Sequence, residues 1–122
     1  MPGSKRARTE SVPTVSTLAG LSRGFADGNG SDARFDEPCS VAVDAEGNVI
    51  VADTGNRIRK VTPDGTVSTL AGSEDEGFAD GNGSNARFND PCGVAVDAEG
   101  NVIVADTCNS CIRKVTPDGT VS

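Results

Sequence analysis

The stretch VAVDAEGNVIVADT occurs at residues 41–54 and returns without one change at residues 94–107. Three more stretches also occur twice: TVSTLAG at 14–20 and 66–72, GFADGNGS at 24–31 and 77–84, and IRKVTPDGTVS at 58–68 and 112–122. The second copy carries two single-residue insertions, one in the loop after Gly72 and one within residues 108–112. Only residues 1–13 lie outside the pattern, so the chain consists of two copies of one structural unit.

Each copy predicts four short strands. In the first copy these are residues 41–43, 49–52, 58–61 and 66–71, separated by turns rich in Gly, Asn, Asp and Pro. The first two strands are apolar along nearly their whole length, so we expect both of their faces to be covered. The last two alternate apolar and polar residues, as strands do when one side meets water. This pattern favours a propeller blade over a parallel β-helix, whose shorter turns would not use hairpin turns such as Pro63-Asp64-Gly65.

The composition excludes several functions. The chain has 122 residues, 11 basic and 18 acidic side chains, a net charge of −7, and no His, Trp or Tyr. We therefore expect no nucleic-acid partner, because that affinity depends on basic groups at phosphates and on aromatic stacking. Without His, the chain cannot form His-ligated zinc sites or His-dependent nucleophiles. No apolar run approaches the length of about 18 residues that a membrane helix needs, so we expect no membrane partner.

The repeated stretches resemble NHL repeats over about residues 14–122. The matching residues are Pro38 with Val41–Asp44 and Gly47–Asp53, then Pro91 with Gly93–Asp97 and Gly100–Asp106. Two departures concern the third strand: the first copy is one residue short where the family usually has His, and the second has Cys111 in place of Arg. Either each turn absorbs the difference, or the third strands differ in register. The resemblance implies a closed ring, commonly of six blades, that serves as a binding platform.

The expected fold is therefore all-β, with two four-stranded antiparallel propeller blades of NHL type and an incomplete ring unless the chain is oligomeric or part of a longer one. We expect a disordered basic tail at residues 1–13, blade 1 at about 24–71, and blade 2 at about 77–122 plus a strand at 14–19. Two blades should leave two open apolar faces, built from Val41, Val43, Val49 and Val51 and from their copies Val94, Val96, Val102 and Val104. Two solutions stay open: three chains forming six blades, or a fragment of a longer repeat protein.

Several residues could carry chemistry, but each also has a structural explanation. Cys108 and Cys111 form half of a zinc or redox motif, yet they lie in a β-turn and are better explained as bystander thiols. Cys39 and Cys92 occupy equivalent positions in the two blades, and we expect them to be too far apart for a disulfide. The loops at 27–32 and 80–84 lack the Glu of a calcium loop, so we interpret them as Gly-rich turns anchored by Phe25, Phe35, Phe78 and Phe88.

The aspartates that recur at strand ends have the same ambiguity. Capping of turn N–H groups explains them better than paired catalytic carboxylates, because they repeat in both units: Asp44, Asp53, Asp97 and Asp106. We therefore expect no catalytic, metal or cofactor site. The ligand or partner surface is unknown from the sequence.

The favoured function is a non-catalytic scaffold that binds a protein or a small ligand, or self-associates through its blade faces. One alternative is a fragment of a propeller hydrolase or lyase similar to lactonases. Another is a recently duplicated or engineered repeat that assembles into a closed propeller. We expect an intracellular protein, cytoplasmic in preference to nuclear, since Lys5-Arg6-Ala7-Arg8 is only a short nuclear import signal.

Overall fold

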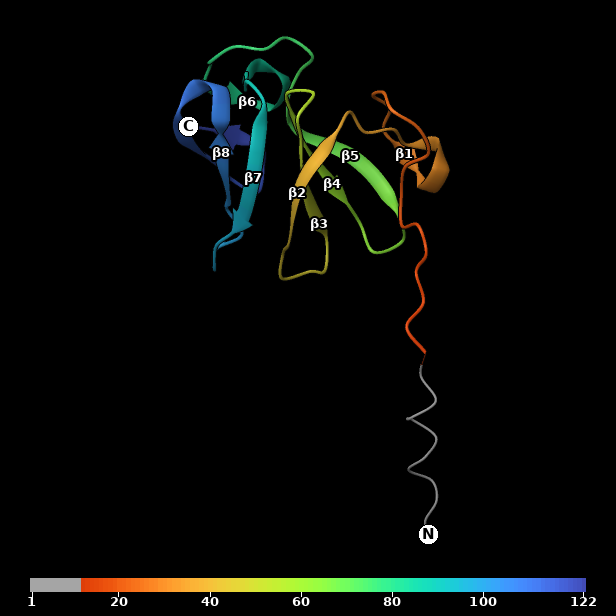
Figure 1. Cartoon of the computed structure of the whole chain (residues 1–122). Helices are drawn as coiled ribbons and strands as arrows, with labels where there is room; N and C mark the ends of the chain where they lie inside the picture. The colour runs from red at the N-terminus through yellow and green to blue at the C-terminus, as the bar shows by residue number, and fades with distance from the viewer. Residues whose placement is uncertain (1–11) are drawn as a thin grey trace.

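The computed structural model describes residues 12–122 and contains two antiparallel sheets of five strands each (Figure 1). The sheet of blade 1 has the order β1-β5-β4-β3-β2 and consists of β1 (Gly28–Asn29), β2 (Pro38–Val43), β3 (Val49–Asp53), β4 (Arg57–Val61) and β5 (Thr66–Gly72). The sheet of blade 2 has the order β6-β10-β9-β8-β7 and consists of β6 (Gly81–Asn82), β7 (Pro91–Val96), β8 (Val102–Asp106), β9 (Cys111–Val115) and β10 (Thr120–Val121). In the described part of the chain, no helix is long and apolar enough to cross a membrane.

The four predicted strands of the first copy are β2 to β5, so the all-β propeller-type fold is confirmed. The prediction of four strands per blade is wrong by one, because the Gly-rich loop adds a short edge strand. In blade 1 this is β1, where Gly28 pairs with Val67 and Asn29 with Thr66. The Asn29 side chain also donates to the Thr66 hydroxyl at 2.9 Å. Two residues without apolar alternation carry no strand pattern, which is why the sequence did not reveal β1 or β6.

The extra residue in the second copy is absorbed by a turn. Asp106 pairs with Cys111 and Ala105 with Ile112, which is the same register as Asp53 with Arg57 and Ala52 with Ile58 in blade 1. The turn contains the short 3-10 helix η3 (Thr107–Asn109), followed by Ser110 at φ 55°. The two third strands therefore present equivalent residues to the same faces.

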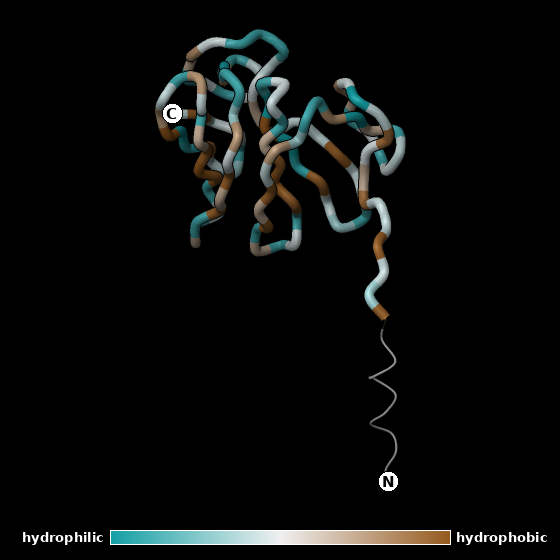
Figure 2. The backbone as a smooth tube through the Cα atoms, in the orientation of Figure 1, coloured by the Kyte–Doolittle hydropathy of each residue, from teal (hydrophilic) through white to brown (hydrophobic). Residues whose placement is uncertain are grey.

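Each blade has two apolar faces, because alternate residues of a strand point to opposite sides. The Ile face of blade 1 contains Ile50, Ala52, Ile58 and Ala71, all buried in the main core cluster. That cluster also contains the Val face of blade 2: Val102, Val104, Val115 and Val121, with Val94 and Val96 packed against it. Within the chain, the Ile face of blade 1 thus packs on the Val face of blade 2. Figure 2 shows the hydrophobic residues following the strands of both blades, with hydrophilic residues in the loops.

The two faces left open differ from those predicted. The Val face of blade 1 is open at its edge, where Val41 and Val43 are 60% and 63% exposed. The copies Val94, Val96, Val102 and Val104 are not an open face, because they form the contact with blade 1. The second open face is instead the Ile face of blade 2, made of Ile103, Ala105 and Ile112. Head-to-tail packing of identical blades covers a different face on each of them.

Candidate functional site

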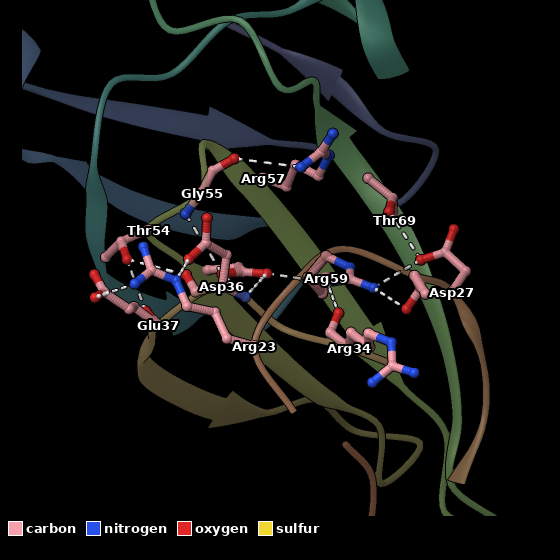
Figure 3. Close-up of polar contacts among 12 residues, drawn as sticks. Arg23, Asp27, Arg34, Asp36, Glu37, Thr54, Gly55, Arg57, Arg59 and Thr69 are labelled. Carbon is pink, nitrogen blue, oxygen red and sulfur yellow. Dashed lines mark hydrogen bonds and ion pairs between the residues drawn. The ribbon is translucent and has the colours of Figure 1, made fainter. Parts of the chain in front are cut away.

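A buried arginine lies in the middle of each blade. Arg59 on β4 is fully buried, and its guanidinium donates to the carboxylates of Asp53 and Asp27 at 2.9 Å each. It also donates to the backbone oxygens of Arg34 and Ala26, both at 2.9 Å (Figure 3). This overturns the expectation that the polar residues of the third strand face water. The loop of residues 24–35 folds over β4, and the hydrogen bonds from Arg59 hold that loop against the sheet.

Blade 2 repeats this arrangement around Arg113. Its guanidinium donates to Asp106 and Asp80 at 2.9 Å each, and to two backbone oxygens of the loop before β7. Two Phe rings flank each guanidinium: Phe25 and Phe35 at Arg59, Phe78 and Phe88 at Arg113, with centroid distances between 4.4 and 5.1 Å. Paired and hydrogen-bonded charges of this kind fix a loop geometry and hold no open site.

The four Phe residues divide into two pairs: Phe88 and Phe35 pack in or against the core clusters, whereas Phe25 and Phe78 are exposed. Only Phe88 is fully buried in the main core, whereas Phe25 and Phe78 are 45% and 60% exposed. The centroid of the Phe25 ring also lies 3.6 Å from the guanidinium carbon of Arg57. These rings cover cations, an interaction that the ring quadrupole favours.

The recurring aspartates divide into two groups. Asp44 and Asp97 cap hairpin turns, as predicted: Asp44 accepts from the N–H groups of Glu46 and Asn48 at 3.0 and 2.8 Å, and Asp97 does the same in blade 2. Burial by itself would raise the pKa of Asp44, but the hydrogen bonds from Asn48 and Glu46 outweigh it and lower that pKa. The side-chain amide of Asn101 is the main cause that lowers the pKa of Asp97.

Asp53 and Asp106 form the second group. Asp53 accepts from the N–H of Asp36 at 2.9 Å, so it caps a turn, but it is also the buried partner of Arg59. Burial raises the pKa of Asp53 above its ordinary value, although the hydrogen bonds and Arg59 favour its charged form. The ion pair was missed in the sequence. The sequence held no signal for it, because all of residues 41–54 and 58–68 recur in the second copy, so the recurrence of Asp53 and Arg59 singles out no pair.

A groove lies between the two blades at the end where the β2–β3 and β7–β8 hairpins turn. Its volume is about 230 Å³, and its apolar lining comes from Ile50, Leu70 and Val102. Charged side chains of both hairpins surround it: Asp44, Glu46, Asp97 and Glu99, with Lys60 as the single cation of the lining. The groove thus combines an apolar floor with an acidic rim.

A wider hollow of about 440 Å³ lies at the other end, near the β3–β4 turn. Cys92 and Cys108 contribute to it, together with charged residues such as Arg23 and Asp36. All four cysteines are free thiols. A hydrogen bond from the Cys108 thiol to Asp90 at 3.4 Å raises the pKa of Cys108, which lowers its reactive thiolate fraction.

Cys39 and Cys92, which we expected to be too far apart for a disulfide, are both free thiols. Their side chains nevertheless interact, and Cys92 is the main cause that raises the pKa of Cys39. The reason is geometric: β2 and β7 are the innermost strands, where neighbouring blades converge. The Val94 N–H lies 3.4 Å from the Ser40 hydroxyl, which shows the same closeness.

No group of three or more Cys, Asp or Glu residues within residues 12–122 is placed to hold a metal ion. The carboxylate of Asp27, in the loop that was compared with a calcium site, accepts hydrogen bonds from Arg59 and from the Thr69 hydroxyl. Lys5-Arg6-Ala7-Arg8 and the predicted tail up to residue 11 lie outside the described residues.

Comparison with known proteins gives the family of the repeat. The NHL repeat model matches residues 88–115. Protein SUPPRESSOR OF QUENCHING 1, chloroplastic, of Arabidopsis thaliana is 36% identical over 91 residues, which are 73% of this chain and 9% of that protein. NHL repeat-containing protein 2 of Gallus gallus is 43% identical over 81 residues, 64% of this chain and 11% of that protein. The chain thus spans about a tenth of the length of these relatives.

Solved structures share the fold. An auxiliary nutrient binding protein from Bacteroides thetaiotaomicron has a TM-score of 0.76 and 31% identity, over 88% of this chain and 29% of that one. Another protein of the same organism, provisionally described as a phosphatase, has a TM-score of 0.71 and 27% identity, over 82% of this chain and 26% of that one. The resemblance to NHL repeats is therefore confirmed, and the two blades correspond to under a third of each solved chain.

Proposed function

Because the chain carries NHL repeats in a propeller-type fold, we propose that it is a non-catalytic binding module whose inter-blade groove takes a basic peptide segment of a protein partner. The observation that carries this proposal is the groove between the hairpin turns, with its apolar floor and four surrounding carboxylates. The named functions of similar proteins differ, a nutrient binding protein in one case and a phosphatase description in another. The proposal therefore rests on the groove itself.

The size of the groove favours a peptide side chain over an enclosed small molecule. Pockets that enclose drug-sized ligands measure about 300–1,000 Å³, and this groove measures about 230 Å³. It has room for one apolar side chain on Ile50 and Val102, while the backbone of the partner stays at the surface. The four carboxylates then attract basic residues on either side of that anchor.

A pair of synthetic peptides tests this proposal. Fluorescein-labelled Arg-Arg-Leu-Arg-Arg should bind, as measured by fluorescence anisotropy, and Glu-Glu-Leu-Glu-Glu should not. Glu46 and Glu99 are exposed and line the groove, so E46Q/E99Q should weaken binding. Each exposed charge pair contributes about 0–1 kcal/mol, so two lost pairs should weaken binding by up to roughly thirtyfold.

The matched control is E74Q/E76Q, which removes the same charge from an exposed loop that does not line the groove. Binding of the basic peptide should stay unchanged in this variant. Equal weakening by both double variants would show general attraction to an acidic protein, and would refute the groove as the site. Absence of any binding by the basic peptide would refute the proposal as a whole.

A further inference from the structure

The two open faces of the chain are the two halves of the contact that already exists inside it. Ile58 on the Ile face of blade 1 is fully buried by blade 2, whereas its counterpart Ile112 is 70% exposed. Val94 and Val96 on the Val face of blade 2 pack against the core, whereas their counterparts Val41 and Val43 are mostly exposed. The open Ile face of blade 2 and the open Val face of blade 1 therefore carry the same kinds of side chains as the two faces that pack together inside the chain. Two copies of the chain could form the same contact between them.

The outer strand β5 of blade 1 pairs with β4 along the whole length of β4. β5 continues past Ser68, so that Thr69, Ala71 and Gly72 pair with Arg59, Ile58 and Arg57. In blade 2, β10 pairs Val121 with Val115, and the N–H of Lys114 donates to the Ser122 oxygen at 2.9 Å. The upper half of β9, at Cys111–Arg113, has no partner strand on that side within the described residues.

The part of β5 that pairs with Arg57–Arg59 has the sequence Thr-Leu-Ala-Gly, and residues 17–20 repeat that sequence. In the single chain, residues 12–18 are exposed and form no strand. Leu18 nevertheless lies beside blade 1 in the same way as Leu70 of β5 lies beside blade 2. A Cβ added to Gly65 would lie 2.9 Å from the Leu18 backbone oxygen, and one added to Gly119 would lie 2.9 Å from the Leu70 oxygen.

We propose that this chain binds further copies of itself head to tail, with the Val face of blade 1 on the Ile face of blade 2 of the next copy. Residues 17–20 of one copy then continue β10 of its neighbour along β9. By equivalence with β5, Thr17 lies opposite Arg113 of the neighbour, Ala19 opposite Ile112, and Gly20 opposite Cys111. This contact is heterologous, and it closes into a ring when the rotation per copy permits.

Three copies are the number that closes the ring. They give six blades, within the range of about 4–8 found in propellers. The chain covers 29% of a similar solved chain, so between three and four such pairs would fill a chain of that length. Three copies come nearest to this length, and in the closed ring each open face is covered by the next copy.

One polar contact supports the strand exchange independently of the apolar faces. In blade 1 the Thr69 hydroxyl donates to Asp27 at 3.0 Å, beside Arg59. Asp80, the counterpart in blade 2, accepts only from Arg113 among the described residues. Thr17 of the next copy would place a hydroxyl at the equivalent position. Both blades would then have the same hydrogen bonds around their buried arginine.

The mass in solution tests the proposal. Sedimentation velocity of the 122-residue chain at micromolar concentration should give three times the 12.4 kDa mass of one chain. I112D and V43D each place a carboxylate on one open face, and each should be a folded monomer, since both positions are exposed in the single chain. The control V12D alters an exposed valine outside the exchanged residues, and it should keep the threefold mass.

Mixing the two face variants gives the decisive result. I112D keeps an intact Val face and V43D keeps an intact Ile face, so an equimolar mixture should form a 1:1 dimer and no larger species. If a variant alone is unfolded, the mixture should restore its far-UV circular dichroism. A wild-type monomer, a mass that grows with concentration, or a mixture that stays monomeric would each overturn the head-to-tail ring.

Discussion

Replacing Asp53 by Asn should destabilise the chain far more than replacing Asp27, although both carboxylates lie 2.9 Å from Arg59. Asp53 has an exposed side-chain fraction of 1%, whereas that of Asp27 is 44%. Leaving a buried charge without its partner costs about 3–5 kcal/mol. An exposed pair is screened by water and contributes about 0–1 kcal/mol. D53N should therefore lose several times more stability than D27N.

R59M should be the most damaging of the three substitutions. Arg59 donates to the backbone oxygens of Arg34 and Ala26 as well as to the two carboxylates. Each buried acceptor that loses its donor costs about 1–3 kcal/mol, so an apolar side chain of similar size cannot replace the arginine. The expected order of destabilisation is R59M, then D53N, then D27N.

The assay is urea unfolding followed by far-UV circular dichroism, because the chain has no Trp for fluorescence. Small domains have total stabilities of about 5–15 kcal/mol, so D53N and R59M should shift the midpoint strongly or leave the chain unfolded in water. Equal midpoints for D53N and D27N, or a loss below about 1 kcal/mol for D53N, would refute the reasoning that burial controls the cost.

Three further predictions concern pH, one glycine and one thiol. The turn aspartates with lowered pKa values (Asp44, Asp64, Asp97 and Asp118) contribute stability that is present above about pH 4 and is lost as pH falls through their folded pKa values. The raised pKa of Asp53 acts in the opposite direction; the urea midpoint should still fall below pH 4, and a midpoint that rises there would contradict the balance. G72A should destabilise strongly, because φ is 98° and a Cβ would lie 2.4 Å from a backbone oxygen, whereas G30A should cost less, since nothing lies within 4 Å; similar midpoints for the two would show that the close contact relaxes. D90N should speed the alkylation of Cys108 by iodoacetamide at neutral pH by removing the main cause of its raised pKa, and an unchanged rate, read by mass spectrometry, would exclude that cause.

The strands and hairpin turns were predictable from the sequence because their signals are local. β-branched runs such as Val49–Val51, separated by Gly and Pro turns, specify strand positions and pairing. The buried Arg59 was not predictable from alternation, since a polar residue between apolar ones normally indicates a solvent-facing side. Its burial depends on the loop of residues 24–35, which lies more than twenty residues earlier in the chain. No local pattern encodes that contact. The joint repetition of Arg59 with Asp53 gave no signal either, because nearly every residue of the first copy recurs in the second.

The identity of the open faces was missed for a different reason. Alternation shows which residues share a face, but it does not show which face the next blade covers. That choice depends on the direction in which the blades stack. It buries Ile58 and exposes Ile112, although the same residues, Arg-Lys-Val, follow both of them in the sequence. The convergence of β2 and β7 follows from the same stacking.

The groove and the head-to-tail ring are linked by this stacking. The groove is made by Asp44 and Glu46 of one blade facing Asp97 and Glu99 of the next. A contact between copies would bring Asp97 and Glu99 of one chain against Asp44 and Glu46 of its neighbour, and so would form the same groove again. A ring would then carry one groove at every contact between blades, and a partner with several basic segments would bind by avidity. A monomer would hold one groove only. The number of basic peptides bound per chain, one or two, therefore measures whether the ring is closed.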